Sequence, residues 1–134
     1  MKAKAYTDLE QSKKLAEILP IESADMSYAT WTILEDGEYI VSPLQGNTIE
    51  KLQEEYGEQI IPCWSLAALL DQLDDIVVDE DGCDYKLEII KEGVQYYLVY
   101  EGMLDAACYE TSLFDDLIDA CVEMIVTLKE KDLL

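Results

Sequence analysis

One segment near the middle of the chain, residues 60–73, constrains the fold most strongly. Its leucines recur at the spacing of a single buried helical stripe: Leu66, Leu69, Leu70 and Leu73. Ser65 directly precedes the stripe, so we expect its hydroxyl to cap the helix. Pro62 has no N–H, which predicts that a strand through residues 60 and 61 ends there. We interpret the segment, including Trp64, as part of the core and not as a binding site.

The chain is long enough to build its own hydrophobic core. It has 134 residues, of which 50% are hydrophobic, and this is typical of one folded domain. We therefore predict a single domain over residues 1–134. Residues 1–6 lack the apolar region of a secretion signal, and the longest apolar run is too short for a membrane helix. These features predict a cytoplasmic protein.

The cysteines are spread along the chain and form no metal-binding motif. None has the Cys-x-x-Cys spacing of a zinc site: Cys63, Cys83, Cys108 and Cys121. Disulfide bonds would need an oxidising compartment, which nothing else in the sequence indicates. We predict four free thiols, no bound metal and no cofactor.

Net charge is the most unusual property of the sequence. Thirty acidic residues against nine basic ones give a net charge of −21, and the chain has neither histidine nor arginine. Binding to nucleic acid or to an anionic membrane requires a basic surface, so we expect neither partner. A basic protein and a cation remain as partners, unless the charge serves only solubility.

Two helices are predicted in the first half from their capping residues. Thr7 and Asn47 are each followed three residues later by a glutamate, which is the pattern of a capping box. Pro20 ends the first helix because the residue before a proline is disfavoured in helical geometry. Gly57 ends the second helix.

The longest helix is predicted at the end of the chain, over residues 112–131. Ser112, with Asp115 three residues on, is the expected cap. The helix has a wide apolar face that we expect to cover a sheet: Phe114, Leu117, Ile118, Cys121, Val122, Ile125 and Leu128.

Residues 28–34 and 39–41 are rich in β-branched and aromatic residues and are predicted to form a hairpin. An Asp-Gly pair between them favours a tight turn. Two glutamates flank that pair and would repel each other across a two-residue loop, so a longer turn over residues 35–38 is the alternative. The expected pairing places Leu34 opposite Tyr39.

A second hairpin is predicted around a loop at Glu92-Gly93. Its apolar side chains then meet in pairs on one face: Ile89 with Tyr96, Leu87 with Leu98, and Tyr85 with Tyr100. The other face carries charged residues and is expected to be half solvated.

Together these elements predict an α+β fold. We expect a two-layer domain with a mainly antiparallel sheet, built from two β-hairpins with about four helices packed on it.

An acidic run between the central helix and the second hairpin is a candidate contact surface for a basic protein. Its members are Asp74, Asp75, Asp79, Glu80, Asp81 and Asp84. The alternative is a solvated connection that turns at Asp81-Gly82. A calcium loop fits poorly, because Val77 would occupy the first ligand position and Glu88 lies in a predicted strand.

The tyrosines of the second hairpin offer two interpretations. Tyr85, Tyr96 and Tyr100 share one face, which is either the core side of the sheet or an exposed aromatic surface. Tyr97 lies on the other face beside Glu88, so we expect it to be an exposed contact residue.

The sequence gives little support for an enzyme. Without histidine, the usual general base and the usual partner of a serine or cysteine nucleophile are missing. Nucleotide-binding and hydrolase motifs are also lacking. Carboxylates are so abundant that no particular pair of them identifies a catalytic site.

Three blocks of sequence carry a resemblance to a known family: residues 7–20, residues 62–70 and residues 119–125. The chain resembles a family of small uncharacterised phage and prophage proteins of gut Bacteroides-type bacteria. The resemblance implies expression in the cytoplasm from a phage-like gene, and it implies no catalytic or binding residue.

These observations favour a non-enzymatic acidic protein that binds a basic protein partner. A narrower form of this hypothesis is nucleic-acid mimicry, in which carboxylates imitate the spacing of phosphates. The alternative is a structural homo-oligomer, or minor assembly component, that associates through the apolar face of helix 112–131.

Overall fold

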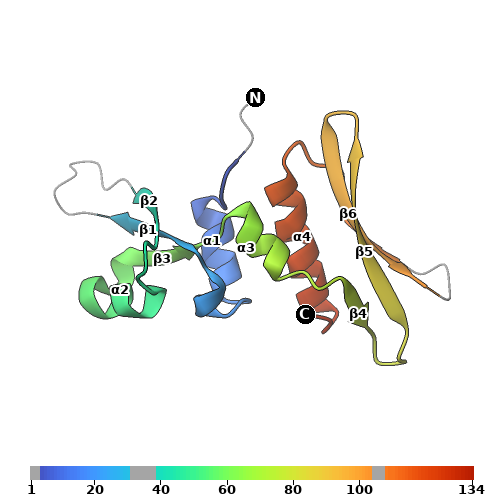
Figure 1. The fold of residues 1–134 in the computed structure, drawn as a ribbon, viewed down its shortest axis with the longest axis horizontal. Helices are drawn as coiled ribbons and strands as arrows, with labels where there is room; N and C mark the ends of the chain where they lie inside the picture. Colours follow the sequence, from blue (N-terminus) through green and yellow to red (C-terminus); the bar gives the residue numbers. More distant parts are fainter. Residues whose placement is uncertain (1–3, 31–38, 104–107) are drawn as a thin grey trace. The chain divides into compact units, whose positions relative to one another are not determined.

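In the residues that it describes, the computed structural model shows an α+β protein with four α-helices and two open antiparallel sheets, which confirms the predicted fold class (Figure 1). The residues that the structure describes are 4–30, 39–103 and 108–134. The chain forms two compact units, and the boundary between them lies inside helix α3, Leu66–Asp71. The N-terminal unit is Tyr6–Ala68, and the C-terminal unit is Met1–Ala5 with Leu69–Leu134. Cooperative folding as one domain stays a prediction.

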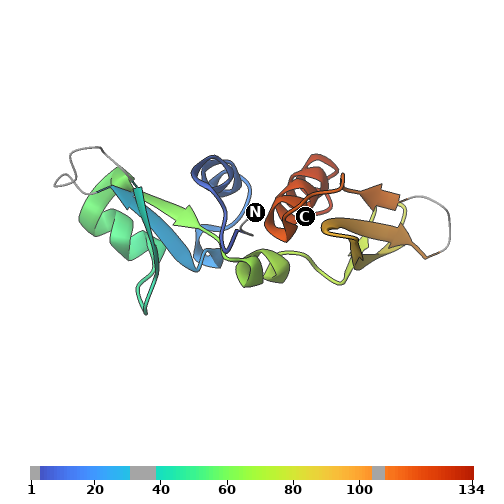
Figure 2. The ribbon, with the colours of Figure 1, turned by 90° about the horizontal axis from the view of Figure 1, so that it is seen from above.

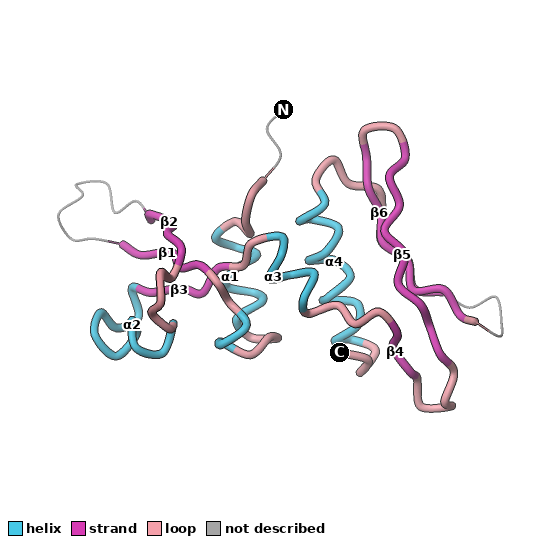
Figure 3. The backbone as a smooth tube through the Cα atoms, in the orientation of Figure 1, coloured by secondary structure: helices cyan, strands magenta, loops and turns pink. Residues whose placement is uncertain are grey.

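The described part of the N-terminal unit combines a three-stranded sheet with two α-helices. Its strands follow the order β2-β1-β3 (Figure 3). Both strand pairs are antiparallel. The elements are α1 Leu9–Ala16, the 3₁₀ turn η1 Ile21–Ser23, β1 Met26–Thr30, β2 Tyr39–Pro43, α2 Ile49–Tyr56, the 3₁₀ turn η2 Gly57–Gln59 and β3 Ile60–Cys63.

The pairing predicted for the first hairpin is wrong. Tyr39 lies opposite Thr30 and not opposite Leu34. The other edge of β1 pairs with β3, so two neighbours together determine which residues of this segment form ladder hydrogen bonds. Leu34 and the predicted turn at residues 35–38 lie outside the described residues.

Helices α1 and α2 each begin one residue later than predicted, with Asp8 and Thr48 as caps in place of Thr7 and Asn47. The Asp8 carboxylate accepts the backbone N–H of Gln11 at 2.8 Å, and the Gln11 side chain accepts the N–H of Asp8 at 3.0 Å. This is a complete capping box. Thr7 is fully buried and its hydroxyl lies 2.7 Å from a second buried hydroxyl, so it takes part in the core and not in a cap.

The segment around Trp64 matches the prediction except at its proline. Pro62 lies inside β3, opposite Ser27, and does not end the strand. An edge strand tolerates proline because one side of its backbone needs no ladder partner. Ser65 caps α3 as predicted, since its hydroxyl accepts the backbone N–H of Ala68 at 3.2 Å. Trp64 is fully buried.

Outside residues 1–3 and 104–107, the C-terminal unit contains a four-stranded sheet and one long helix. The strands follow the order β4-β5-β6-β7, and every pair is antiparallel. The helix α4 packs against β6 (Figure 2). The elements are β4 Ile76–Val78, β5 Asp84–Glu92, β6 Gln95–Gly102, β7 Cys108–Glu110 and α4 Leu117–Glu130.

The cap of α4 is Asp116 and not Ser112, which corrects the prediction. Phe114 exchanges backbone hydrogen bonds of 2.7 and 2.9 Å with Tyr96 of β6, so the chain around it is still extended. The helix can begin only after this bridge. The Asp116 carboxylate then accepts the backbone N–H of Ile118 at 2.8 Å.

The second hairpin has the predicted faces but a different register. Ile89 lies opposite Leu98 and not opposite Tyr96, which is a shift of two residues. The turn consists of Gly93-Val94, and Gly93 has a φ of 65°, a value that favours glycine at the first position of a two-residue loop. Because side chains alternate with a period of two, this shift leaves every side chain on its predicted face.

Helix α4 is buried within the single chain. Half of its 14 residues are buried: Ile118, Ala120, Cys121, Val122, Met124, Ile125 and Leu128. Self-association through residues 112–131 would need these side chains to be uncovered, and that alternative stays a prediction. Among the described residues, no helix has the length and apolar character needed to cross a membrane.

Candidate functional site

The four-stranded sheet has one face against α4, and within the described part of this unit no element covers the other face (Figures 1 and 2). Tyr85 on the covered face is 5% exposed, and Leu98 and Tyr100 are 0% exposed. The Tyr100 hydroxyl donates to the carbonyl of Asp74 at 2.6 Å, and burial raises the pKa of this hydroxyl. Tyr96 is half-buried. The interpretation of Tyr85 and Tyr100 as core residues is therefore confirmed.

The uncovered face, hereafter the open face, is strongly acidic. Strand pairing brings alternate residues of all four strands onto it. Its acidic residues, all exposed, are Asp84, Glu88, Glu92, Glu101 and Glu110. Among the described residues of this face, Lys86 is the single basic one. Apolar side chains lie between the charges: Ile76, Val78, Ile90, Tyr97 and Val99.

A depression of about 210 Å³ lies on the open face between β5, β6 and β7. Val99 is only 8% exposed and forms the apolar floor. Glu88 and Glu110 lie opposite Val99 on the two neighbouring strands, which places their backbones about 10 Å apart. The full lining is Glu88, Ile90, Tyr97, Val99, Glu101, Cys108 and Glu110. The depression thus combines an apolar floor with carboxylates on several sides.

Tyr97 forms part of the wall of the depression. It is half-buried and not fully exposed, which modifies the expectation for this residue. Burial raises the pKa of its hydroxyl, and the charges of Glu110, Glu92 and Glu88 raise it further. The tyrosine ring therefore lies among carboxylates, an arrangement that disfavours any additional negative charge.

The predicted acidic run contains one residue that stabilises a turn, Asp79, and five exposed carboxylates. Asp79 holds the turn between β4 and β5, because one of its oxygens accepts the backbone N–H groups of Asp81 and Cys83, both at 2.9 Å. Its other oxygen accepts the Tyr85 hydroxyl at 2.9 Å. The Cys83 N–H and the Tyr85 hydroxyl lower the pKa of Asp79. Asp79 is therefore a structural residue of the turn, an outcome close to the solvated-connection alternative.

The other members of the predicted acidic run are exposed. Asp84 starts β5 and lies on the open face, whereas the rest precede β4 or lie in the β4–β5 turn: Asp74, Asp75, Glu80 and Asp81. The sequence reasoning did not identify Glu101, Cys108 and Glu110 as site residues. Positions 108–110 read Cys-Tyr-Glu, and this central tyrosine between two more polar residues is the signal that could have indicated a strand with Cys108 and Glu110 on one face.

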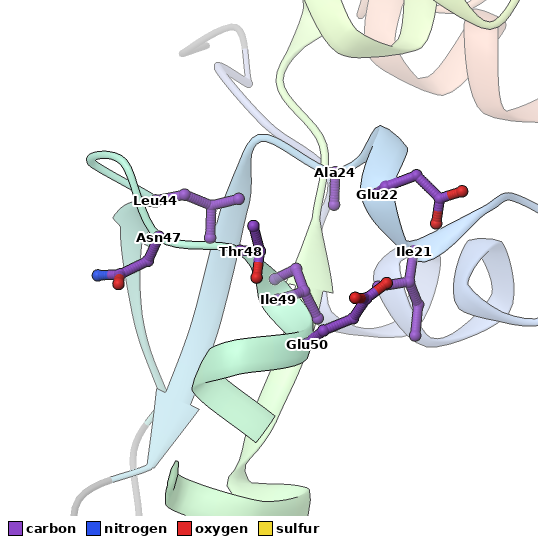
Figure 4. A pocket seen from close by; sticks show the side chains of 8 residues that line it. All are labelled: Ile21, Glu22, Ala24, Leu44, Asn47, Thr48, Ile49 and Glu50. Carbon is purple, nitrogen blue, oxygen red and sulfur yellow. The ribbon is translucent and has the colours of Figure 1, made fainter. Parts of the chain in front are cut away.

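A second cavity, of about 160 Å³, lies in the N-terminal unit between η1 and the start of α2. Figure 4 shows the side chains of Leu44 and Ile49 around it and the carboxylate of Glu50 beside Ile21. The hydroxyl of Thr48 already accepts a backbone N–H of α2, as its cap. The cavity offers apolar contact but no convergent set of polar groups that would select a ligand.

No disulfide bond joins the four cysteines, as predicted: Cys63 and Cys121 are buried, Cys83 is half-buried and Cys108 is exposed. In the described ranges, no three histidine, cysteine or acidic side chains come close enough to hold a metal ion. Comparison with protein-family models, curated proteins and solved structures finds no match to this chain. The resemblance to small phage proteins stays a prediction.

Proposed function

We propose that this chain is a non-enzymatic acidic protein that binds a basic protein partner through the open face of the C-terminal sheet. The observation that carries the proposal is the composition of this face, where five exposed carboxylates accompany a single lysine among the described residues. No ion pair is recorded within the described part of the chain for Glu88, Glu101 or Glu110. These carboxylates are therefore available to a cationic partner.

Physical chemistry favours association over simple solubility for this surface. An acidic face of this kind speeds the encounter with a basic protein and disfavours acidic competitors. Charge alone would serve solubility equally well on any face. Here, however, exposed apolar residues share the face with the carboxylates, including Ile76 at 46% and Val78 at 54% exposure, and they gain free energy when a partner covers them.

The open face fits general recognition of a basic protein better than it fits the narrower hypothesis of nucleic-acid mimicry. Along β5 the outward-facing residues alternate in character, with Lys86 and Ile90 lying between Asp84, Glu88 and Glu92. Successive carboxylates on this face of β5 are thus four residues, or about 13 Å, apart along the strand. This distance is roughly twice the spacing of neighbouring positions on the face, because a residue that is not acidic lies between each two carboxylates. The proposal includes action in the cytoplasm and an origin in a phage-like gene, both of which rest on the sequence.

A pull-down experiment tests this proposal. The protein is immobilised and exposed to host lysate at two salt concentrations. Raising the salt from about 50 mM to about 500 mM shortens the Debye length roughly threefold, so a partner held by charge should be released. The specificity control is a variant with Glu88→Gln, Glu101→Gln and Glu110→Gln, all on the open face. Its matched control removes three exposed glutamates of the N-terminal unit: Glu10→Gln, Glu54→Gln and Glu55→Gln.

The expected result is one basic protein retained by the wild type and by the matched control, and lost by the open-face variant. Equal retention by the two variants would show that net charge, and not this face, attracts the partner. Retention of no protein at either salt concentration would contradict the proposal.

A further inference from the structure

The depression on the open face suggests how the partner is recognised. Building on the proposed function, we propose that the depression receives one long cationic side chain of the partner protein, a lysine or an arginine. Its aliphatic stem packs on Val99, Ile90 and the Tyr97 ring, and its charged end lies among Glu88, Glu101 and Glu110.

The residues that line the depression indicate that its occupant is positively charged. Three carboxylates from three neighbouring strands surround the depression, and its lining contains no basic side chain. Glu110 and Glu88 also raise the pKa of the Tyr97 hydroxyl, which places these charges close to the ring. An anion would be repelled here, while a cation would reduce the repulsion between the carboxylates.

The apolar floor of the depression indicates that the occupant has a hydrocarbon stem. Val99 is 8% exposed and Ile90 and Tyr97 are half-buried, so the base and one wall of the depression are apolar. A compact hydrated cation would gain nothing from these groups. Lysine and arginine instead bury a hydrocarbon stem while the charged end reaches polar groups, and arginine or lysine also packs favourably on an aromatic ring.

The spacing of the carboxylates argues against a bare metal ion. The backbones of Glu88 and Glu110 are about 10 Å apart across Val99, and a metal ion needs oxygen ligands at about 2.0–2.6 Å. No metal-binding group of side chains occurs in the described residues. A volume of about 210 Å³ instead suits a single long side chain.

A polypeptide accounts for the surface beyond the depression. Asp84 and Glu92 lie at the two ends of the same face of β5, on either side of Glu88. A basic segment lying across the sheet can place additional cationic side chains near these carboxylates while one side chain enters the depression. A small free amine would leave both ends of the face without contacts.

Calorimetric titration with four matched peptides tests the inference. The peptides share a weakly basic sequence and differ at one position, which carries lysine, arginine, diaminobutyric acid or norleucine. Diaminobutyric acid keeps the charge but has a shorter stem, whereas norleucine keeps the stem without the charge. We expect lysine and arginine to bind similarly, and the short-stemmed cation and norleucine to bind about fivefold more weakly or worse.

Two substitutions locate the effect. Tyr97→Phe retains the ring and should preserve the preference for lysine over diaminobutyric acid, whereas Tyr97→Ala should remove it. Ile76→Ala, on the same face but outside the depression, should leave the preference unchanged. Circular dichroism of each variant confirms that the fold is retained.

The outcomes separate this inference from the proposed function. Equal binding of lysine and diaminobutyric acid peptides to the wild type would overturn stem recognition, while salt-sensitive binding of both would leave the proposed function standing. Absence of binding by every cationic peptide at low salt would contradict both.

Discussion

Leu98 and Ile89 provide a sharp test of the second hairpin, because they lie opposite each other on the same face yet differ in burial. Leu98 is 0% exposed and Ile89 is 45% exposed. Truncating each to alanine removes a similar hydrocarbon side chain from the same sheet. The structure predicts that the two losses of stability differ.

The magnitudes follow from burial. Leu98→Ala removes a fully buried side chain and leaves a cavity, which costs about 3 kcal/mol. Ile89→Ala removes a side chain already half in water and leaves no closed cavity, so the cost is about 1 kcal/mol. Isoleucine has the higher strand propensity, so the loss of propensity is larger for Ile89→Ala; this narrows the difference between the two variants but does not reverse it.

Urea unfolding followed by far-ultraviolet circular dichroism measures both losses. With an m-value of about 2 kcal/mol/M, the midpoint should fall by about 1.5 M for Leu98→Ala and by about 0.5 M for Ile89→Ala. Equal shifts, or a larger shift for Ile89→Ala, would refute the conclusion that Leu98 is fully buried under α4 while Ile89, on the same face, is half exposed.

Three further predictions concern cooperativity, thiol reactivity and pH. Both tryptophans belong to the sequence Tyr6–Ala68, so if the chain folds as one domain, Leu98→Ala should shift the unfolding midpoint seen by tryptophan fluorescence as much as that seen by circular dichroism. An unchanged fluorescence midpoint would show that the two units unfold independently. Exposed Cys108 should react with a thiol reagent in the native state, whereas Cys121, whose pKa is raised to about 12 by burial and then by a nearby carboxylate, should react only after unfolding; labelling of Cys121 in the native state, located by mass spectrometry, would contradict this. The pKa of Asp79 is lowered from its usual 3.8 in the folded state, so the stabilisation by its charge is complete above that pH and is lost as the pH falls through the folded value. The stability difference between the wild type and Asp79→Asn should therefore be constant near neutral pH and shrink in acid, and a difference that grows in acid would contradict this reasoning.

Local chemistry explains what could be predicted from the sequence. The alternation of apolar and charged residues along β5 and β6 determined which side chains share a face, and the structure keeps that sorting. The register escaped prediction because a shift of two residues preserves the same sorting. Gly93 decides the register by occupying the first position of the turn, a choice that the facial pattern alone does not distinguish.

The candidate site was harder to predict because it depends on pairing between distant residues. Glu88, Glu101 and Glu110 belong to three strands, and only the ladder joining β5, β6 and β7 brings them around Val99. The structural role of Asp79 was not predicted, for a related reason. Its role in the turn follows from hydrogen bonds to Cys83 and other residues beyond it, which composition does not reveal.

Amide chemical-shift mapping of the isotope-labelled protein during titration with a lysine-rich peptide tests the central claim most directly. The account predicts shifts concentrated on the open face, in β5, β6 and β7 around Val99, that disappear at high salt. Shifts centred on the β4–β5 turn or on the N-terminal unit, or shifts spread evenly over all acidic residues, would contradict it.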